Sequence, residues 1–320
     1  MPFRRSGVLT ALAAFTALSL AGCGSGNTPA APSATPGSDA PLSVVTSTNV
    51  YGSIAQAVGG DRVAVTSLIN DPAADPHSYE STPGDAAKVA GASLVLYNGG
   101  GYDDFMERLV QSSGAKPSVI NVTQLSGLAP PEPAGSDTAP ADDPSFNEHL
   151  WYSLPTVQKV ADQIASDLGT ADPTDAARFT SNAQAFKGKV ADLITKEQAI
   201  GTAHPGARVA ITEPVPGYLV QAAGLTDVTP PAFSEAIEED TDPPAAVLQQ
   251  TLDLFTTNPV QLLILNAQTE TPTTTQVEQA AQAANVPVVK VTETLPAGVN
   301  DYITWMGSEI DAVANALNGS

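Results

Sequence analysis

The sequence has 320 residues, of which 34 are acidic and 13 basic, giving a formal net charge of −21. A chain this acidic is not expected to bind nucleic acid or anionic lipid by electrostatic attraction. It contains one cysteine, Cys23, which excludes an internal disulfide, so the fold must be stabilised by its core.

The first 22 residues are typical of a secretory signal peptide. Two arginines precede an apolar run over residues 8–20 that is too short for an ordinary membrane span. The Leu-Ala-Gly that precedes Cys23 resembles a bacterial lipobox, which implies cleavage before Cys23 and lipid attachment to it. A plain secretory signal is the alternative. Residues 23–40 are rich in Gly, Ser, Pro and Ala and are interpreted as a flexible tether.

Residues 41–170 alternate between strand-like and helix-like patterns, and we expect them to form a first lobe. This alternation favours a mostly parallel sheet covered by helices. The proline-rich, acidic segment 128–145 is interpreted as a mobile surface loop. The expected strands cover residues 42–47, 62–69, 93–98 and 118–122, and the expected helices cover residues 50–58, 83–90, a stretch through 105–109, and 154–168.

Residues 171–203 are predicted to form one long connecting helix. It would open at Asp172-Pro173 and keep its helical apolar spacing to about Ala199, which is long enough to run along two lobes. Residues 204–320 repeat the strand and helix alternation and form the predicted second lobe. The expected strands cover 208–212, 262–266 and 286–291, and the expected helices lie near 215–223, 244–255, 273–284 and 301–317. The predicted fold is therefore α/β, with two lobes and a cleft between them.

His77 lies in a loop that the sequence marks as rigid. The loop follows the strand-like run 62–69, contains two Asp-Pro steps, and ends at Thr82-Pro83, which is typical of a helix start. A histidine taken alone is usually a surface residue. However, the chain has only three histidines, and His149 lies in a similar setting before another helix. Both are therefore candidate ligands.

Two acids follow strands of the second lobe. Glu213 comes after the run 208–212, and Glu293 comes after the run 286–291. Open α/β sheets place ligand groups at the carboxyl ends of their strands. Two imidazoles and two carboxylates suit a borderline divalent metal such as zinc or manganese. Asp301 is a competing acid, but at a helix start it would have a capping function.

These segments together resemble the metal-receptor family of ABC-transporter solute-binding proteins, over essentially all of residues 41–318. The family's Asp-Pro-His-x-Tyr-Glu loop is matched by Asp75–Glu80, and its Asx-x-His-x-Trp segment by Asn147–Trp151. The resemblance implies that His77, His149, Glu213 and Glu293 bind the metal in the interlobe cleft. The third ligand is histidine in many zinc receptors and glutamate in others.

The resemblance implies Zn²⁺ as the ion, with Mn²⁺ as the alternative. The segment 128–145 lacks the histidines that many zinc receptors carry there, and the carboxylates at positions 213 and 293 make the site richer in oxygen. The third histidine, His204, lies at a helix end and is interpreted as a surface or capping residue.

The predicted function is capture of the ion and its delivery to an ABC-transporter permease. The expected protein is a monomer, held by lipid on Cys23 at the outer face of the cytoplasmic membrane, with no nucleic acid partner. A metal-binding adhesin or a metal buffer without a transporter would use the same site. A zinc hydrolase is disfavoured because the chain has no His-Glu-x-x-His motif, so we do not expect an enzyme.

Overall fold

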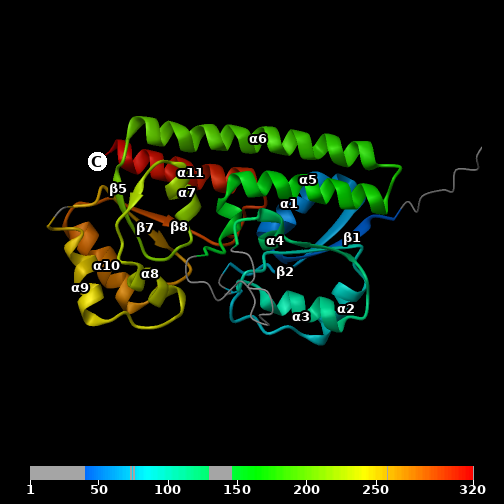
Figure 1. The fold of residues 1–320 in the computed structure, drawn as a ribbon, viewed down its shortest axis with the longest axis horizontal. Coiled ribbons are helices and arrows are strands. Elements are labelled where there is room, and N and C mark those ends of the chain that lie inside the picture. Colours follow the sequence, from blue (N-terminus) through cyan, green and yellow to red (C-terminus); the bar gives the residue numbers. More distant parts are fainter. Residues whose placement is uncertain (1–39, 73, 75, 130–145, 258, 320) are drawn as a thin grey trace, which may run out of the picture. The chain divides into compact units, whose positions relative to one another are not determined.

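The computed structural model describes residues 40–72, 74, 76–129, 146–257 and 259–319. The predicted signal peptide, Cys23, the predicted tether up to residue 39, Asp75 and residues 130–145 lie outside these ranges. The first lobe precedes the long helix of the chain (Figure 1). Its elements are β1 (Leu42–Thr48), α1 (Asn49–Gly59), η1 (Gly60–Arg62), β2 (Val63–Ile69), α2 (Pro83–Ala90), β3 (Leu94–Tyr97), α3 (Asp104–Ser112), β4 (Ser118–Asn121), α4 (Val122–Ser126), η3 (Leu150–Tyr152) and α5 (Leu154–Ala171).

The strands of the first lobe form a parallel sheet in the order β2-β1-β3-β4. Along β1, Val44 faces one side of the sheet and Val45 faces the other, and both are buried because helices cover the two faces. Capping residues fix where the helices begin. Thr82 and Asp85 form the capping box predicted at the start of α2.

The second lobe repeats this plan with the strand order β6-β5-β7-β8, again all parallel. The two sheets flanked by helices confirm the predicted α/β fold. The elements of this lobe are β5 (Arg208–Ile211), α7 (Gly217–Ala222), β6 (Thr226–Asp227), α8 (Pro231–Glu238), α9 (Ala245–Asp253), β7 (Leu262–Asn266), α10 (Pro272–Ala283), β8 (Val288–Val291) and α11 (Tyr302–Asn318).

The long helix α6 (Ala176–Ala203) has 28 residues, about 42 Å at 1.5 Å per residue. It runs along both lobes, over α5 and α1 of the first and α11 and α7 of the second (Figure 1). The helix begins later than the predicted Pro173. The carboxylate of Asp172 bonds instead to Arg62, at 2.9 Å, and to the Thr174 amide, at 3.1 Å, so Asp172 closes a turn before the helix.

One hydrophobic cluster is shared by the two lobes. It joins the inner faces of both sheets to α6 and α11, with Val44 and Leu96 from the first lobe, Phe186 from α6, and Ile264 and Ile310 from the second lobe. The outer face of each sheet has a cluster of its own, against α2 and α3 in the first lobe and α8 to α10 in the second. The lobes are therefore joined by a common core as well as by α6.

Hydrogen bonds also cross between the lobes near the loop that follows β8. Asn49, at the start of α1, accepts from the Leu295 amide at 3.0 Å and donates to the Leu295 carbonyl at 3.2 Å. The Tyr152 hydroxyl donates to the Thr292 carbonyl at 2.7 Å. These bonds hold the segment that carries Glu293 against the first lobe.

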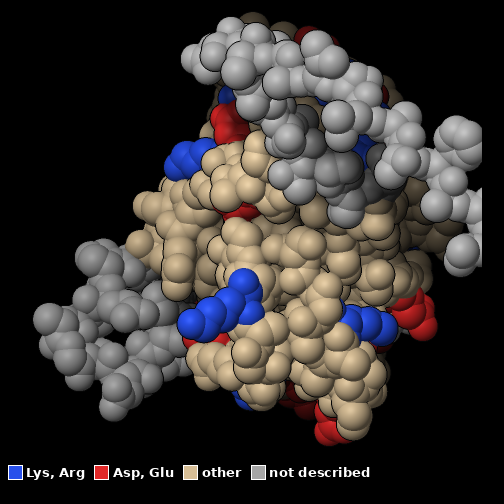
Figure 2. All heavy atoms as spheres, turned by 90° about the vertical axis from the view of Figure 1, so that its right-hand side faces the viewer, with Lys and Arg blue, Asp and Glu red and all other residues tan. Residues whose placement is uncertain are grey.

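Besides the 3₁₀ helices η1 and η3, three elements of the structure were not predicted, namely α4, β6 and α8. The first and second are short, with five and two residues. On the face shown in Figure 2, charged side chains of both signs lie scattered among uncharged ones. No helix within the described part of the chain is long and apolar enough to cross a membrane.

Candidate metal centre

A cavity of about 490 Å³ lies between the two lobes. The first lobe contributes the loop after β2 and the segment before η3. The second contributes the ends of β5, β7 and β8 and the end of α8. The acidic and imidazole side chains that line it are His77, Glu148, Glu213, Glu235, Glu238, Glu239, Asp240 and Glu293.

His77 lies on the turn that follows β2. The Tyr79 amide donates to the Pro76 carbonyl at 3.4 Å, and the Tyr79 hydroxyl donates to Asp85 of α2 at 3.1 Å, so the turn is tied to the next helix. The imidazole packs edge-on against the Tyr102 ring, with 5.0 Å between centroids. This support aims a partly exposed imidazole at the cleft.

His149 is fully buried, and its neighbour Asn147 decides its tautomer. The Asn147 amide nitrogen donates to the Pro214 carbonyl at 2.9 Å, so the amide oxygen faces the histidine. That oxygen lies 2.7 Å from His149 Nδ1, which must therefore carry the hydrogen. The lone pair is then left on Nε2, the atom that points into the site. Metal-binding histidines usually have such a partner on their second nitrogen.

Glu213 follows β5 and is 3 % exposed. Thr212, the residue before it, donates its amide to the Ile264 carbonyl and accepts the Asn266 amide on its hydroxyl, at 3.1 and 3.0 Å. These bonds continue the sheet contacts past β5 and fix the backbone at Glu213. The Glu213 Oε2 atom is buried and has no hydrogen-bond partner.

Glu293 follows β8 and is oriented by two polar residues at the end of β7. Asn266 donates its side-chain amide to Glu293 Oε1 at 2.8 Å, and Gln268 accepts the Glu293 backbone amide at 2.5 Å. The other carboxylate oxygen, Oε2, is buried without a hydrogen-bond partner. Gln268 also donates to the carbonyl of Pro72, so it connects this loop to the His77 loop.

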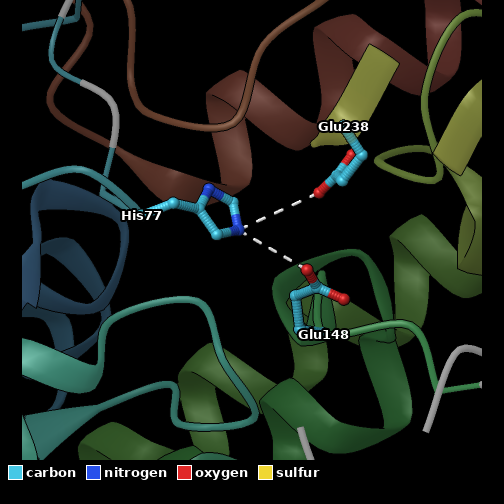
Figure 3. Close-up of side chains that lie close together, drawn as sticks. All are labelled: His77, Glu148 and Glu238. Carbon is cyan, nitrogen blue, oxygen red and sulfur yellow. Dashed lines mark ion pairs between the residues drawn. The ribbon is translucent and has the colours of Figure 1, made fainter. Parts of the chain in front are cut away.

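Two further carboxylates, those of Glu148 and Glu238, lie close to His77 (Figure 3). Glu148 Oε1 lies 3.5 Å from His77 Nε2. Glu238 Oε1, from the last residue of α8, lies 3.9 Å from His77 Nε2 and 3.3 Å from His149 Nε2. One ligand-type atom each from His77, Glu148 and Glu238 lie within 4.8 Å of one another. The two lobes thus meet at this group of side chains.

Burial and mutual repulsion perturb the titration of these groups. Burial raises the pKa of Glu213 to about 7, and the charge of nearby Glu293 adds to the rise. Burial, followed by the charges of Glu148, Glu213 and Glu293, also raises the pKa of Glu238. Burial lowers the pKa of His149, which keeps its imidazole neutral. A cation in the cleft would relieve the repulsion and accept the Nε2 lone pair.

The structure brings three of the four predicted residues to the lining of the cleft and buries the fourth, His149, beside it. His77, Glu213 and Glu293 line it, and His149 reaches it through its contact with Glu238. Sequence reasoning missed Glu148 and Glu238 as members of the group. Glu148 lies inside the quoted Asn147–Trp151 motif, and Glu238 opens an acidic run at the end of a short helix that was not predicted.

The remaining candidates have structural functions elsewhere. Asp301 accepts the Thr304 amide at 2.7 Å and caps α11. His204 ends α6, as predicted, and its ring lies 3.0 Å from the Asn318 side chain. Cys23 lies outside the described residues.

A long helix joins the two α/β lobes, and imidazole and carboxylate side chains gather at the cleft between them. This arrangement is that of a solute-binding protein of the metal-receptor class. A family model agrees with this. The family described as zinc-uptake complex component A, periplasmic (ZnuA), matches residues 44–316. The chain belongs to this family, whose members are solute-binding proteins and not enzymes.

Relatives within the family differ in the ion that their names give. The chain is 29 % identical over 211 residues to the manganese-binding lipoprotein MntA of Bacillus subtilis, covering 62 % of this chain and 64 % of that one. It is 30 % identical over 192 residues to the iron-binding protein YfeA of Yersinia pestis, covering 60 % and 57 %. The fold matches the periplasmic zinc-binding protein TroA of Treponema pallidum with a TM-score of 0.69 at 18 % identity, covering 87 % of this chain and 99 % of that chain.

Proposed function

We propose that this protein captures one divalent transition-metal ion in the interlobe cleft and delivers it to the permease of an ABC transporter. His77 and His149 would bind the ion through Nε2, and Glu213 and Glu293 through a carboxylate oxygen. The histidines come from the first lobe and the acids from the second, so the ion would join the two.

One observation carries this proposal. His149 Nε2, Glu213 Oε2 and Glu293 Oε2 are buried and have no hydrogen-bond partner. Each such atom costs about 1–3 kcal/mol when it is left without a partner. All three atoms offer electron pairs. To satisfy them by hydrogen bonds, the protein would have to bring a separate N–H or O–H group to each. A divalent cation satisfies them together.

The ion belongs to the zinc and manganese class. Imidazole nitrogens with carboxylate oxygens suit Zn²⁺, and additional oxygen ligands shift the site toward Mn²⁺. The names of the relatives, which include a manganese-binding and an iron-binding protein, support a divalent transition metal without choosing one.

We propose further that lipid attached to Cys23 holds the protein at the outer face of the cytoplasmic membrane. The sequence before Cys23 supports this, and so does the name of the Bacillus subtilis relative, a lipoprotein. Residues 23–40 would let the folded part reach the permease. Delivery is supported by membership of a family described as a component of an uptake complex.

Purification without chelator, followed by elemental analysis, tests the binding step. We expect one metal ion per chain, and calorimetry on stripped protein should show one tight site for Zn²⁺ or Mn²⁺. A chain that carries no metal and binds none would refute the proposal. Uptake of labelled metal by cells lacking the gene tests delivery, because a buffer or an adhesin would leave uptake unchanged.

A further inference from the structure

We infer that Glu238 is an additional ligand of the bound ion and gives the site a preference for a cation of higher coordination number and harder ligands, of the Mn²⁺ kind. The inference rests on the proposed function and names the class of ion that the same cleft favours. Glu238 comes from α8, the helix that the sequence pattern did not predict. Geometry, helix polarity and an unsatisfied pair of atoms support it independently.

The distances around Glu238 match one coordination shell. Two ligand atoms that each lie about 2.1 Å from a shared ion, at octahedral or tetrahedral angles, are about 3.0–3.4 Å apart. The Oε1 atom of Glu238 lies 3.3 Å from His149 Nε2, inside that range. Its distance to His77 Nε2 is 3.9 Å, which a small rotation of the exposed His77 ring would shorten. The same oxygen can therefore share an ion with both imidazoles.

The facing atoms on Glu238 and His149 suit a cation placed between them, because both offer electron pairs when Glu238 is ionised. The hydrogen bond from Nδ1 to Asn147 leaves His149 Nε2 as an electron-pair donor. The Glu238 Oε1 atom is also a donor of electron pairs. Both atoms are buried without a hydrogen-bond partner. Two lone pairs aimed at each other repel, and a metal ion converts the repulsion into two bonds.

The end of α8 carries its acids where the helix itself disfavours them. The helix closes with the Asp240 amide donating to the Ile237 carbonyl and the Thr241 amide donating to the Ala236 carbonyl, at 3.1 and 2.8 Å. This is a Schellman motif, with Asp240 in the left-handed region at φ 51°. Glu238 is therefore the last helical residue, held at the negative end of the helix dipole. The helix dipole does not stabilise a carboxylate at this end. A cation beside Glu238 would be stabilised by the carboxylate and by the negative end of the helix.

A fifth protein ligand changes which ion fits best. Zinc sites are almost always four-coordinate, and His77, His149, Glu213 and Glu293 already supply four ligands. Manganese prefers six ligands and accepts carboxylate oxygens readily. Adding Glu238 gives two nitrogens and three carboxylates, with room for water in a cavity of about 490 Å³. Glu238 should therefore contribute more to Mn²⁺ binding than to Zn²⁺ binding.

The test compares Glu238→Gln with Asp242→Asn. The second variant removes the same charge from an exposed residue just past the end of α8 that does not line the cavity. Dissociation constants for Mn²⁺ and Zn²⁺ would be measured by calorimetry on stripped protein, with circular dichroism melts to confirm folding. We expect Glu238→Gln to weaken Mn²⁺ binding at least about tenfold and Zn²⁺ binding less than about threefold, as expected for a ligand that only Mn²⁺ uses fully. Asp242→Asn should change either constant by less than about threefold, because an exposed charge outside the cavity is screened.

Three outcomes would overturn the inference: unchanged Mn²⁺ affinity in Glu238→Gln, equal weakening of both ions, or equal effects in Glu238→Gln and Asp242→Asn. Electron paramagnetic resonance of bound Mn²⁺ adds a second readout, because loss of a carboxylate ligand changes its zero-field splitting. His149→Ala separates this inference from the proposed function. Loss of all metal binding in His149→Ala, with Mn²⁺ affinity kept in Glu238→Gln, would refute only the role of Glu238. Full binding in His149→Ala would refute the proposed ligand set itself.

Discussion

In the first sheet, β2 leads into the loop of His77, while in the second sheet the strand at the same place in the order, β6, leads toward α8 and Glu238. The two lobes have the same strand order, yet the first brings both imidazoles and one carboxylate, that of Glu148, to the site, and the second brings carboxylates only. The scaffold thus determines where ligands lie, and the loops determine which atoms they offer. An ion held by the proposed ligands would contact both lobes, since its nitrogen ligands come from the first and its proposed carboxylates from the second.

The largest expected effect comes from removing the nitrogen ligands. His77→Ala and His149→Ala should each weaken metal binding more than about 100-fold, because loss of a direct ligand exceeds the effect of losing its supporting partner. Calorimetry on stripped protein measures this. His204→Ala removes the third histidine from the end of α6 and should bind metal normally. Unchanged affinity in either site variant would remove that residue from the proposed ligands.

On the oxygen side, Glu293→Gln should weaken metal binding by about 10–100-fold at little cost in stability, because the amide keeps the size and loses the charge. The matched variant is Asp301→Asn, which can still cap α11 through its side-chain oxygen. It should leave both affinity and melting temperature unchanged. If metal binding were lost in Asp301→Asn alone, Asp301 and not Glu293 would be the metal ligand.

A substitution of Asn147 tests the contact that this residue makes between the two lobes at the site. Its side chain holds the His149 tautomer and bonds to Pro214, next to Glu213. Asn147→Ala should weaken metal binding about tenfold, as expected of a residue that orients a ligand without contacting the ion. The ring of His149 would then be free to adopt the other tautomer, which nitrogen NMR of labelled histidine detects. Metal affinity equal to that of the unaltered protein would show that burial alone orients the ring.

The pH dependence of metal affinity tests the carboxylate side of the site, through the titration of Glu213 in the second lobe. The metal requires an ionised Glu213, whose pKa is raised to about 7, so protons compete with the metal as the pH falls. Affinity should change little above about pH 7 and approach a tenfold fall per pH unit below it, for the proton that the metal displaces from Glu213. Proton release on binding, measured by calorimetry in buffers of different ionisation enthalpy, checks this. Release of no protons at pH 6.5 would contradict a neutral Glu213 in the empty site.

The smallest expected effect lies away from the cleft, on α6. Glu197 is buried, its Oε1 has no hydrogen-bond partner, and burial raises its pKa to about 8. A carboxyl whose pKa is raised on folding destabilises the fold as the pH rises from its unfolded value toward 8. Glu197→Gln should therefore melt like the unaltered protein at pH 5 and a few degrees higher at pH 9. Equal melting temperatures at pH 9 would show that Glu197 is ionised at no cost.

Much of this arrangement could be predicted from the sequence, because local chemistry marks it. Runs such as 93–98 and 262–266 are apolar throughout, as strands covered on both faces must be, and Thr82 with Asp85 specifies a helix start. The start of α6 could not be read, because Asp172 has the pattern of a cap but bonds to the distant Arg62. A tertiary contact of this kind leaves no local signal.

The same holds for the site, where some residues could be predicted from the sequence and others could not. The two histidines lie in motifs, and the two predicted acids follow recognisable strands. Glu238 could not be identified, because α8 has only eight residues, too few for a clear helical period, and its acidic end has the pattern of a solvated surface. Only the packing of α8 against the second sheet brings that carboxylate to the histidines of the other lobe.

The shared core and α6 have a consequence for how a permease distinguishes a loaded protein from an empty one. With the lobes joined by one hydrophobic cluster, by a 28-residue helix and by bonds such as Asn49 to Leu295, their relative position should change little when the ion leaves. What does change is the charge in the cleft, which becomes more negative by the two charges of the ion less any proton that Glu213 takes up. We expect the signal of loading to be electrical more than geometric, and a permease surface bearing basic side chains could sense it without a large movement of either lobe.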